Sequence, residues 1–295
     1  MKNLIEGAYD LHVHSGPDIL PRRMDDIEMA QRVIESGMAG YAIKSHFFCT
    51  AERASLINKL YPGCDAIGAV VLNNAVGGIN PIAVEMAARA GAKIVWMPTC
   101  DSAHEQKLVF GGEHKGKLPY WATLAIRLRE EGVKIKELSI LDTDGKLTKE
   151  TCEVLDVIAR HDMILESGHL SQPEVFILIK EAARRGVKRM LITHADYPGT
   201  YYTIDQQKEL VQYGAYIEHC YTTWATKKVD FEETVEQIRA VGPEHATLAT
   251  DLGQKTAKYP DEGLLEFAVK LYEAGFSEDE IHMMAVTNPR YLLNK

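Results

Sequence analysis

The chain has 295 residues, of which 46% are hydrophobic and 25% are charged, a composition typical of a folded protein with a buried core. Its formal net charge of -9 argues against a nucleic-acid partner, because such partners bind basic surfaces. No apolar stretch is long enough to cross a bilayer, and the first residues turn polar too early for a secretory signal. The five cysteines form no CxxC pair, so neither a disulfide framework nor a thiolate zinc site is indicated. We therefore expect a cytoplasmic protein without membrane or nucleic-acid partners.

Short apolar runs alternate with amphipathic stretches along the chain. The apolar runs predict eight strands, at residues 8–13, 40–45, 66–72, 92–98, 162–167, 188–193, 214–219 and 246–250. Helical patterns lie between them, including 25–37, 81–91, 174–186 and 231–242, and each of these four ends in glycine. Strands that alternate with helices are typical of parallel sheets, and eight such units predict a (β/α)8 barrel of the TIM type. We expect this α/β barrel to be one domain over residues 1–295.

One segment interrupts the alternation. Residues 100–121 form a long, polar, glycine-rich stretch after the fourth strand, and we expect a long loop there. Loops of this length are usually functional lids or disordered segments. Phe110 and the segment PYW at 119–121 either line such a lid or pack as ordinary core residues.

The predicted strand ends carry most of the candidate functional residues, and active sites of such barrels lie where the carboxyl ends of the strands meet. His12 and His14 lie two apart in a strand, so they point to the same side. The other residues at strand ends are Lys44, His46, His169, His194, His219 and Asp251. Imidazole and carboxylate are the usual ligands of divalent zinc, iron, nickel and manganese. We therefore predict a metal site with a water of lowered pKa and Asp251 as its base.

Each residue taken singly also has an ordinary structural interpretation. His12 and His14 fit polar edge positions, His169 and His194 fit core histidines bonded to carbonyls, and Asp251 fits a helix N-cap. It is their joint occurrence at strand ends that favours a metal.

For two further side chains the sequence allows either a functional or a structural role. Lys44 either binds a substrate carboxylate or phosphate as a point charge or forms a structural ion pair. His219 either contacts substrate or makes a hydrogen bond within the barrel.

The motifs DLHVHSG, GHLS, THAD and ATD, together with the terminal VTNPRYLL, resemble the amidohydrolase superfamily of metal-dependent hydrolases. The resemblance covers nearly the whole chain. It implies a TIM-type barrel whose metal ligands are His12, His14, His169, His194 and Asp251, with Asp251 also the base.

The chain departs from that superfamily at the fourth strand. Many binuclear members carry a bridging Lys or Glu there, whereas this sequence reads IVWMPTCDS. Either the site is mononuclear or another residue supplies the bridge, and Lys44, His46 and Glu166 are the candidates. Glu166 has a second interpretation, in which it points outward from the barrel.

The segments DLHVHS and GYAIKSHFF are also similar, in part, to the polymerase-and-histidinol-phosphatase (PHP) phosphoesterases. That family has Thr-Asp-His on its second strand, where this chain has Lys-Ser-His. The similarity implies that His46 is a second-metal ligand and that the substrate is a phosphate ester.

The sequence therefore predicts an enzyme, a metal-dependent hydrolase that uses a metal-activated water on an amide, lactone or ester. Its partner is a small-molecule substrate, for which an anionic group is one option, and a homo-oligomer is left open. We expect one or two divalent ions, with zinc ahead of manganese, iron and nickel. One alternative is a metal-dependent decarboxylase or lyase of the same superfamily, in which Lys44 holds a substrate carboxylate. A second is a PHP-like phosphoesterase. A third is a non-catalytic barrel that binds its partner through residues 100–121.

Overall fold

The computed structural model describes residues 4–111 and 118–295, in which parallel strands alternate with helices. One sheet has the order β1 (Tyr9–Val13), β2 (Gly40–Ile43) and β3 (Asp65–Ile67). The other contains, in order, β4 (Ala69–Val71), β5 (Ile94–Trp96), β6 (Ile164–Glu166), β7 (Arg189–Ile192), β8 (Ala215–Cys220) and β9 (Ala246–Ala249). Strands that follow one another in sequence are neighbours in space, as in a barrel.

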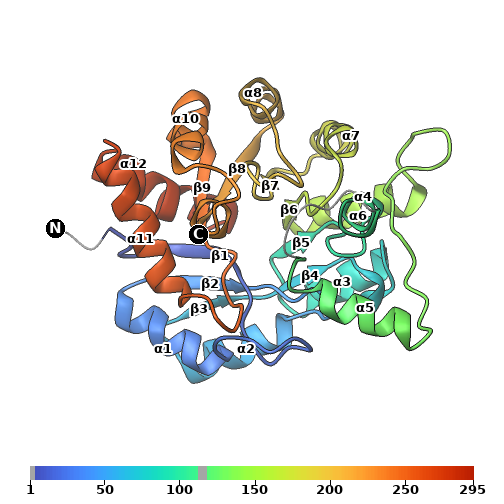
Figure 1. Ribbon diagram of the computed structural model, residues 1–295, viewed down its shortest axis with the longest axis horizontal. Coiled ribbons are helices and arrows are strands. Elements are labelled where there is room, and N and C mark those ends of the chain that lie inside the picture. The colour runs from blue at the N-terminus through green and yellow to red at the C-terminus, as the bar shows by residue number, and fades with distance from the viewer. Residues whose placement is uncertain (1–3, 112–117) are drawn as a thin grey trace.

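Helices surround the strands on the outside (Figure 1). They are α1 (Asp26–Ser36), α2 (Ala51–Leu60), α3 (Pro81–Arg89), α6 (Lys149–His161), α7 (Gln172–Arg184), α8 (Ile204–Gln212), α10 (Phe231–Val241) and α11 (Pro260–Glu273). The helical patterns predicted at 25–37, 81–91, 174–186 and 231–242 are confirmed as α1, α3, α7 and α10. Shorter helices are α4 (Ala103–Phe110), α5 (Ala122–Glu130), α9 (Tyr221–Ala225), α12 (Glu278–His282) and α13 (Asn288–Leu292), with 3-10 turns η1 (Asn74–Val76) and η2 (Pro243–His245) and a π-helical turn η3 (Met283–Thr287).

The third predicted strand, 66–72, is divided at Gly68 into β3 and β4. A Cβ atom on Gly68 would lie 2.6 Å from the Cα of Ala51, so glycine is what allows the start of α2 to approach the strand. β3 pairs with β2 and β4 pairs with β5, so the ladder of strand pairs is interrupted there. The TIM-type architecture is confirmed, but the ladders do not form one continuous closed ring.

The second interruption lies between β9 and β1, and residues 250–252 connect the two strands. The amide of Asp251 donates to the carbonyl of His12 at 2.8 Å, and the amide of His14 donates to the carbonyl of Leu252 at 2.8 Å. Just before these residues in the two strands, the Thr250 hydroxyl donates to Oδ2 of Asp10 at 2.5 Å. The first and last strands are therefore joined by the same residues that the sequence singled out for metal binding.

The expected long loop at 100–121 is in part a helix. Ser102 caps α4, because its hydroxyl accepts a hydrogen bond from the amide of Glu105 at 3.0 Å. Residues 112–117 of the predicted loop lie outside the described residues. Trp121 is buried and its ring lies 5.9 Å from that of Phe110, so these aromatics pack in a small core. That core, which we call the cap cluster, consists of Leu20, Cys100, Val109, Trp121, Ala122 and Ala125.

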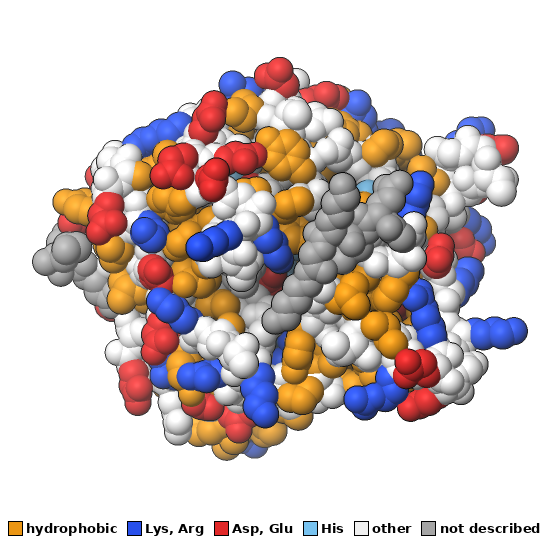
Figure 2. Space-filling model, viewed as in Figure 1, with side chains coloured by type: hydrophobic (Ala, Val, Ile, Leu, Met, Phe, Trp, Pro, Cys, Tyr) orange, Lys and Arg blue, Asp and Glu red, His pale blue; other side chains and the backbone are white. Residues whose placement is uncertain are grey.

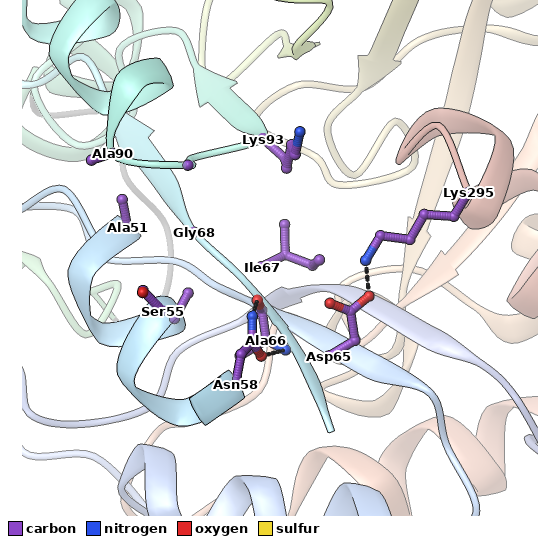
Figure 3. Close-up of a pocket in the computed structure, with 12 residues that line it drawn as sticks. Ala51, Ser55, Asn58, Asp65, Ala66, Ile67, Gly68, Ala90, Lys93 and Lys295 are labelled. Carbon is purple, nitrogen blue, oxygen red and sulfur yellow. Dashed lines mark hydrogen bonds and ion pairs between the residues drawn. The ribbon is translucent and has the colours of Figure 1, made fainter. Parts of the chain in front are cut away.

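The amino-terminal end of the barrel is closed by apolar packing. Leu292 and Leu293 of the last helix and its C-cap pack with Tyr9, Ile94 and Ile164, which begin or lie near the start of their strands. Outside this packing lies a pocket of about 260 Å³, between α2 and the amino ends of β3 and β5. Figure 3 shows Lys295 reaching Asp65 at its edge.

The outer surface carries charges of both signs. On the face shown in Figure 2, acidic and basic side chains are interspersed with apolar ones. Among the helices of residues 4–111 and 118–295, none combines the length and apolar character needed to span a membrane.

Candidate metal centre

Three of the predicted ligands meet at the carboxyl end of the barrel. Nε2 of His12 and Nε2 of His14 each lie 3.2 Å from the same oxygen, Oδ1 of Asp251. Nitrogen and oxygen ligands that share one tetrahedral zinc at roughly 2.0–2.2 Å are about 3.3 Å apart. The three ligand atoms thus already have the spacing of neighbours around one ion, and they form one of the groups of potential ligands among the described residues.

The orientation of each histidine is fixed by a bond to its other ring nitrogen. Nδ1 of His12 lies 3.1 Å from Oε2 of Glu218, and Nδ1 of His14 lies 3.0 Å from the carbonyl oxygen of Lys44. Carboxylate and carbonyl oxygens only accept, so Nδ1 carries the proton in both rings. In their neutral forms, both histidines therefore direct the lone pair of Nε2 at Asp251, which is the arrangement of a metal-ligating imidazole.

His169 and His194 form a second pair of candidate ligands beside the first. Their Nε2 atoms are 3.2 Å apart, and the ring of His194 lies 5.9 Å from that of His12. Nδ1 of His194 lies 3.0 Å from the hydroxyl of Thr200, whereas the buried Nδ1 of His169 has no hydrogen-bond partner among the described residues. The chemistry of this pair, two close nitrogens directed at each other, fits a bound cation.

The backbone at two of the candidate ligands is in a conformation that side chains seldom adopt. Asp251 has φ of 52° and His194 has φ of 29°. Near them, a Cβ atom on Gly253 would overlap the carbonyl oxygen of His14, so glycine is required there. Strained backbone of this kind is concentrated at functional sites, where the surrounding structure maintains it.

Asp251 carries the charge that the cluster needs. Burial favours the neutral acid, but His12 and His14 outweigh it and hold the pKa of Asp251 well below its ordinary value. Its second oxygen, Oδ2, accepts a hydrogen bond from the hydroxyl of Thr222 at 3.1 Å. The carboxylate is therefore ionised, and both of its oxygens are positioned.

Lys44 lies inside this cluster. It is 1% exposed, its Nζ lies 2.7 Å from Nε2 of His12, and the ring centre of Trp96 is 5.1 Å away. Burial lowers the pKa of Lys44, although Asp251 and Glu218 act in the opposite direction. The amine and a metal ion would compete for the same nitrogen of His12.

The charge of His12 depends on the same neighbours. Burial and the Lys44 ammonium lower the pKa of His12, but Glu218 and Asp251 outweigh them and raise it to about 9.

Glu166 takes the inward of its two possible orientations. It is fully buried, and Oε2 accepts a hydrogen bond from the hydroxyl of Thr193 at 2.8 Å, whereas Oε1 has no partner among the described residues. Burial and the nearby Glu218 raise the pKa of Glu166 well above its ordinary value.

His46 and His219 occupy different environments. The ring of His46 stacks on that of His14 at 4.9 Å, and its Nδ1 lies 2.9 Å from the hydroxyl of Thr99, so it lines the edge of the cluster. His219 follows Glu218 in β8 and therefore faces the opposite side of the strand. Its Nδ1 lies 3.3 Å from Oδ2 of Asp196, so the structure does not bring it to the other candidates.

The sequence reasoning missed Glu218. Its carboxylate holds Nδ1 of His12 and also accepts the amide of His194 at 3.0 Å, so it connects both groups of candidate ligands. The motif YIEHC contained the signal, because only one of two adjacent strand residues can face the barrel interior.

The fold is shared with several solved structures. An amidohydrolase from Pseudomonas aeruginosa is 12% identical with a TM-score of 0.65, and the match covers 99% of this chain and 97% of the other. A TatD homologue from Escherichia coli is 16% identical with a TM-score of 0.61 and 99% of both chains covered. A putative 2-pyrone-4,6-dicarboxylic acid hydrolase from Pseudomonas putida is 14% identical with a TM-score of 0.58, covering 98% and 97%. At these identities the likeness shows the fold, and it agrees with the resemblance to the amidohydrolase superfamily.

The sequence comparison assigns the family. No curated protein matches the sequence. A model described as "Family of unknown function (DUF6282)" matches residues 7–218, and the chain belongs to this family. The matched range includes His12, His14, His169 and His194 and ends before Asp251.

Proposed function

We propose that this protein is a metal-dependent hydrolase that cleaves an amide, lactone or ester bond in a small molecule. The observation that carries the proposal is the convergence of His12 Nε2 and His14 Nε2 on one oxygen of Asp251, 3.2 Å from each. His169 and His194 either complete that site or hold a second ion. The barrel fold shared with an amidohydrolase and a pyrone hydrolase supports the same class.

A divalent ion held by these residues would lower the pKa of a bound water to about 7. Asp251 would then accept a proton from the attacking water and return it to the leaving group. Thr222 holds Oδ2 of Asp251 at 3.1 Å, which orients the carboxylate during the transfer. In the neutral ring of His12, Glu218 keeps the proton on Nδ1, so Nε2 is the atom that would bind an ion.

The position of Lys44 favours hydrolysis over decarboxylation. The decarboxylase alternative needs Lys44 to hold a substrate carboxylate. Its Nζ is instead engaged by His12 at 2.7 Å and lies near the carboxylates of Glu218 and Asp251. An anionic substrate would be repelled by these two carboxylates at that position.

The test begins with metal content. Purified protein, loaded with zinc or manganese, is compared by elemental analysis with the double variant His12→Ala, His14→Ala. We expect one or two ions per wild-type chain, and we expect the variant to lose the ion that His12 and His14 bind.

The second part of the test is activity. The loaded protein is assayed on N-acyl amino acids, lactones and activated esters, and we expect hydrolysis that a chelator abolishes and added metal restores. Wild-type protein without metal would overturn the proposal. Release of carbon dioxide from acids, or of phosphate from phosphate esters, in place of hydrolysis would identify the lyase or the phosphoesterase instead.

A further inference from the structure

The loop between β1 and α1 lies beside the candidate metal centre and is fixed on two sides. The amide of Gly16 donates to the carbonyl of Met24 at 2.9 Å, which closes the loop on itself. The amide of Arg23 donates to the carbonyl of Gly253 at 2.9 Å, and Arg22 pairs with Gln254, three residues after Asp251.

The other side of the loop meets the cap cluster, where Leu20 packs. In addition, the hydroxyl of Tyr120 donates to the carbonyl of Pro21 at 2.9 Å. Arg22 is therefore carried on a well-anchored segment between the cap cluster and the residues that follow β9.

The guanidinium of Arg22 is buried but only half engaged. Its side chain is 4% exposed, and Nε and Nη2 donate to the same oxygen, Oδ2 of Asp18, at 2.9 and 2.7 Å. Nη1 makes no hydrogen bond to any described residue. Asp18 thus occupies the Nε–Nη2 edge and leaves the Nη1–Nη2 edge, with two parallel N–H groups, free. Asp18 therefore fixes the guanidinium in place, and the remaining N–H groups can donate to a ligand.

Arg22 lies beside the metal candidates in the fold. It pairs with Gln254, and a Cβ atom on the neighbouring Gly253 would overlap the carbonyl oxygen of His14. The charge of Arg22 accordingly contributes, after burial, to the lowered pKa of His14. The ring of His14 stacks on that of His46 at the edge of the cluster.

We propose that Arg22 binds a carboxylate group of the substrate through its free guanidinium edge, so that the substrate is a carboxylate-bearing amide, lactone or ester. This assignment rests on the proposed hydrolase function and specifies its substrate class. Two parallel N–H groups match the two oxygens of a planar carboxylate. The adjacent Asp18 carboxylate repels a phosphate dianion more strongly than a carboxylate monoanion, which favours the carboxylate.

The experiment uses metal-free protein, so that a carboxylate cannot bind through an ion. Binding of glutarate is measured by calorimetry beside glutaramide, its neutral diamide, and inorganic phosphate. The variants are Arg22→Gln, Arg22→Lys and the control Arg23→Gln. Arg23 is the exposed neighbouring arginine, and its guanidinium carbon lies 4.6 Å from the ring centre of Tyr259.

We expect glutarate to bind wild-type protein, glutaramide not to bind, and Arg22→Gln to weaken glutarate binding roughly ten- to a hundredfold. Arg22→Lys keeps the charge but loses the parallel donors, so its affinity should fall between the two. Arg23→Gln should bind as wild type does. Circular dichroism checks folding, and if Arg22→Gln is unfolded, Arg22→Lys carries the test.

The proposal is overturned if metal-free wild-type protein binds no glutarate, or if Arg22→Gln or Arg22→Lys binds it with wild-type affinity. Tighter binding of phosphate than of glutarate, lost in Arg22→Gln, would also overturn it and point to a phosphate ester. Zinc is then added back to part of the same preparations, and the zinc bound per chain is measured. A chain that binds glutarate but no zinc would refute the hydrolase while leaving the Arg22 site in place, so the two failures are distinguishable.

Discussion

The two ends of the barrel are built from the same strands but have opposite chemistry. At the carboxyl end, His12, His14 and Asp251 are held close together, with a buried lysine at 2.7 Å from one of them. At the amino end, Leu292 and Leu293 fill the interior with apolar side chains, and the charged pair of Lys295 and Asp65 stays partly exposed at the edge of a pocket. Buried charge is costly unless it is paired or binds an ion, so charge that is concentrated at one end indicates function there and stability at the other.

The largest effect should come from Asp251, and the same chemical change at the other end provides the control. Asp251→Asn removes the carboxylate base, so we expect the rate of hydrolysis to fall roughly 10²- to 10⁴-fold. Asp65→Asn, measured in the same assay, should leave the rate and the zinc content unchanged. Equal losses in the two variants would mean that the two ends do not differ in function.

Substitution of Glu218 should lower the affinity for the metal ion. Glu218→Gln weakens the acceptor that orients His12, and loss of such a partner typically lowers metal affinity about 10- to 100-fold. Competition with a chromophoric chelator measures this affinity. Glu174→Gln, which changes a buried carboxylate in the capping box of α7, is the matched control and should bind zinc as wild type does. An unchanged zinc affinity in Glu218→Gln would refute the positioning role.

Lys44 should have an effect of the opposite sign. Lys44→Met removes a positive charge and a competitor for Nε2 of His12, so we expect zinc affinity to rise on the order of tenfold. The same chelator competition gives the answer. A fall in affinity would instead support the remaining hypothesis that Lys44 supplies a bridging ligand.

The smallest effect should come from the amino end. Lys295→Ala removes a partly exposed ion pair with Asp65, and such pairs contribute about 0–1 kcal/mol to the free energy of unfolding. Urea denaturation measures the change, and zinc content should be unaltered. A loss of zinc in this variant would show that the two ends are coupled.

The strands were predictable because buried parallel strands appear as apolar runs, and each predicted run overlaps an observed strand. The division of the third strand at Gly68 could not be predicted. It depends on the close approach of Ala51, which is a contact between two elements and does not change the local pattern of apolar residues. The start of α4 was missed although Ser102 and Glu105 have the spacing of a helix cap, because the glycines that follow suggested a loop.

At the site, the histidines at strand ends were predictable from position alone, and the structure brings His12, His14 and Asp251 together as expected. The choice between Glu218 and His219 required knowing which face of β8 is interior. Arg22 lies in an irregular segment, DILPRRMDD, where no periodicity indicates the direction of a side chain. Its importance follows only from the bonds to Asp18, which depend on the folded loop.

The connection between the first and last strands has a consequence for biosynthesis. Because Asp251 reaches His12 only through residues 250–252, the ligand triad cannot assemble until residue 251 has left the ribosome. A nascent chain carries the paired imidazoles long before the carboxylate that completes them. A translation product that terminates prematurely before residue 251 would therefore retain these histidines yet lack the triad.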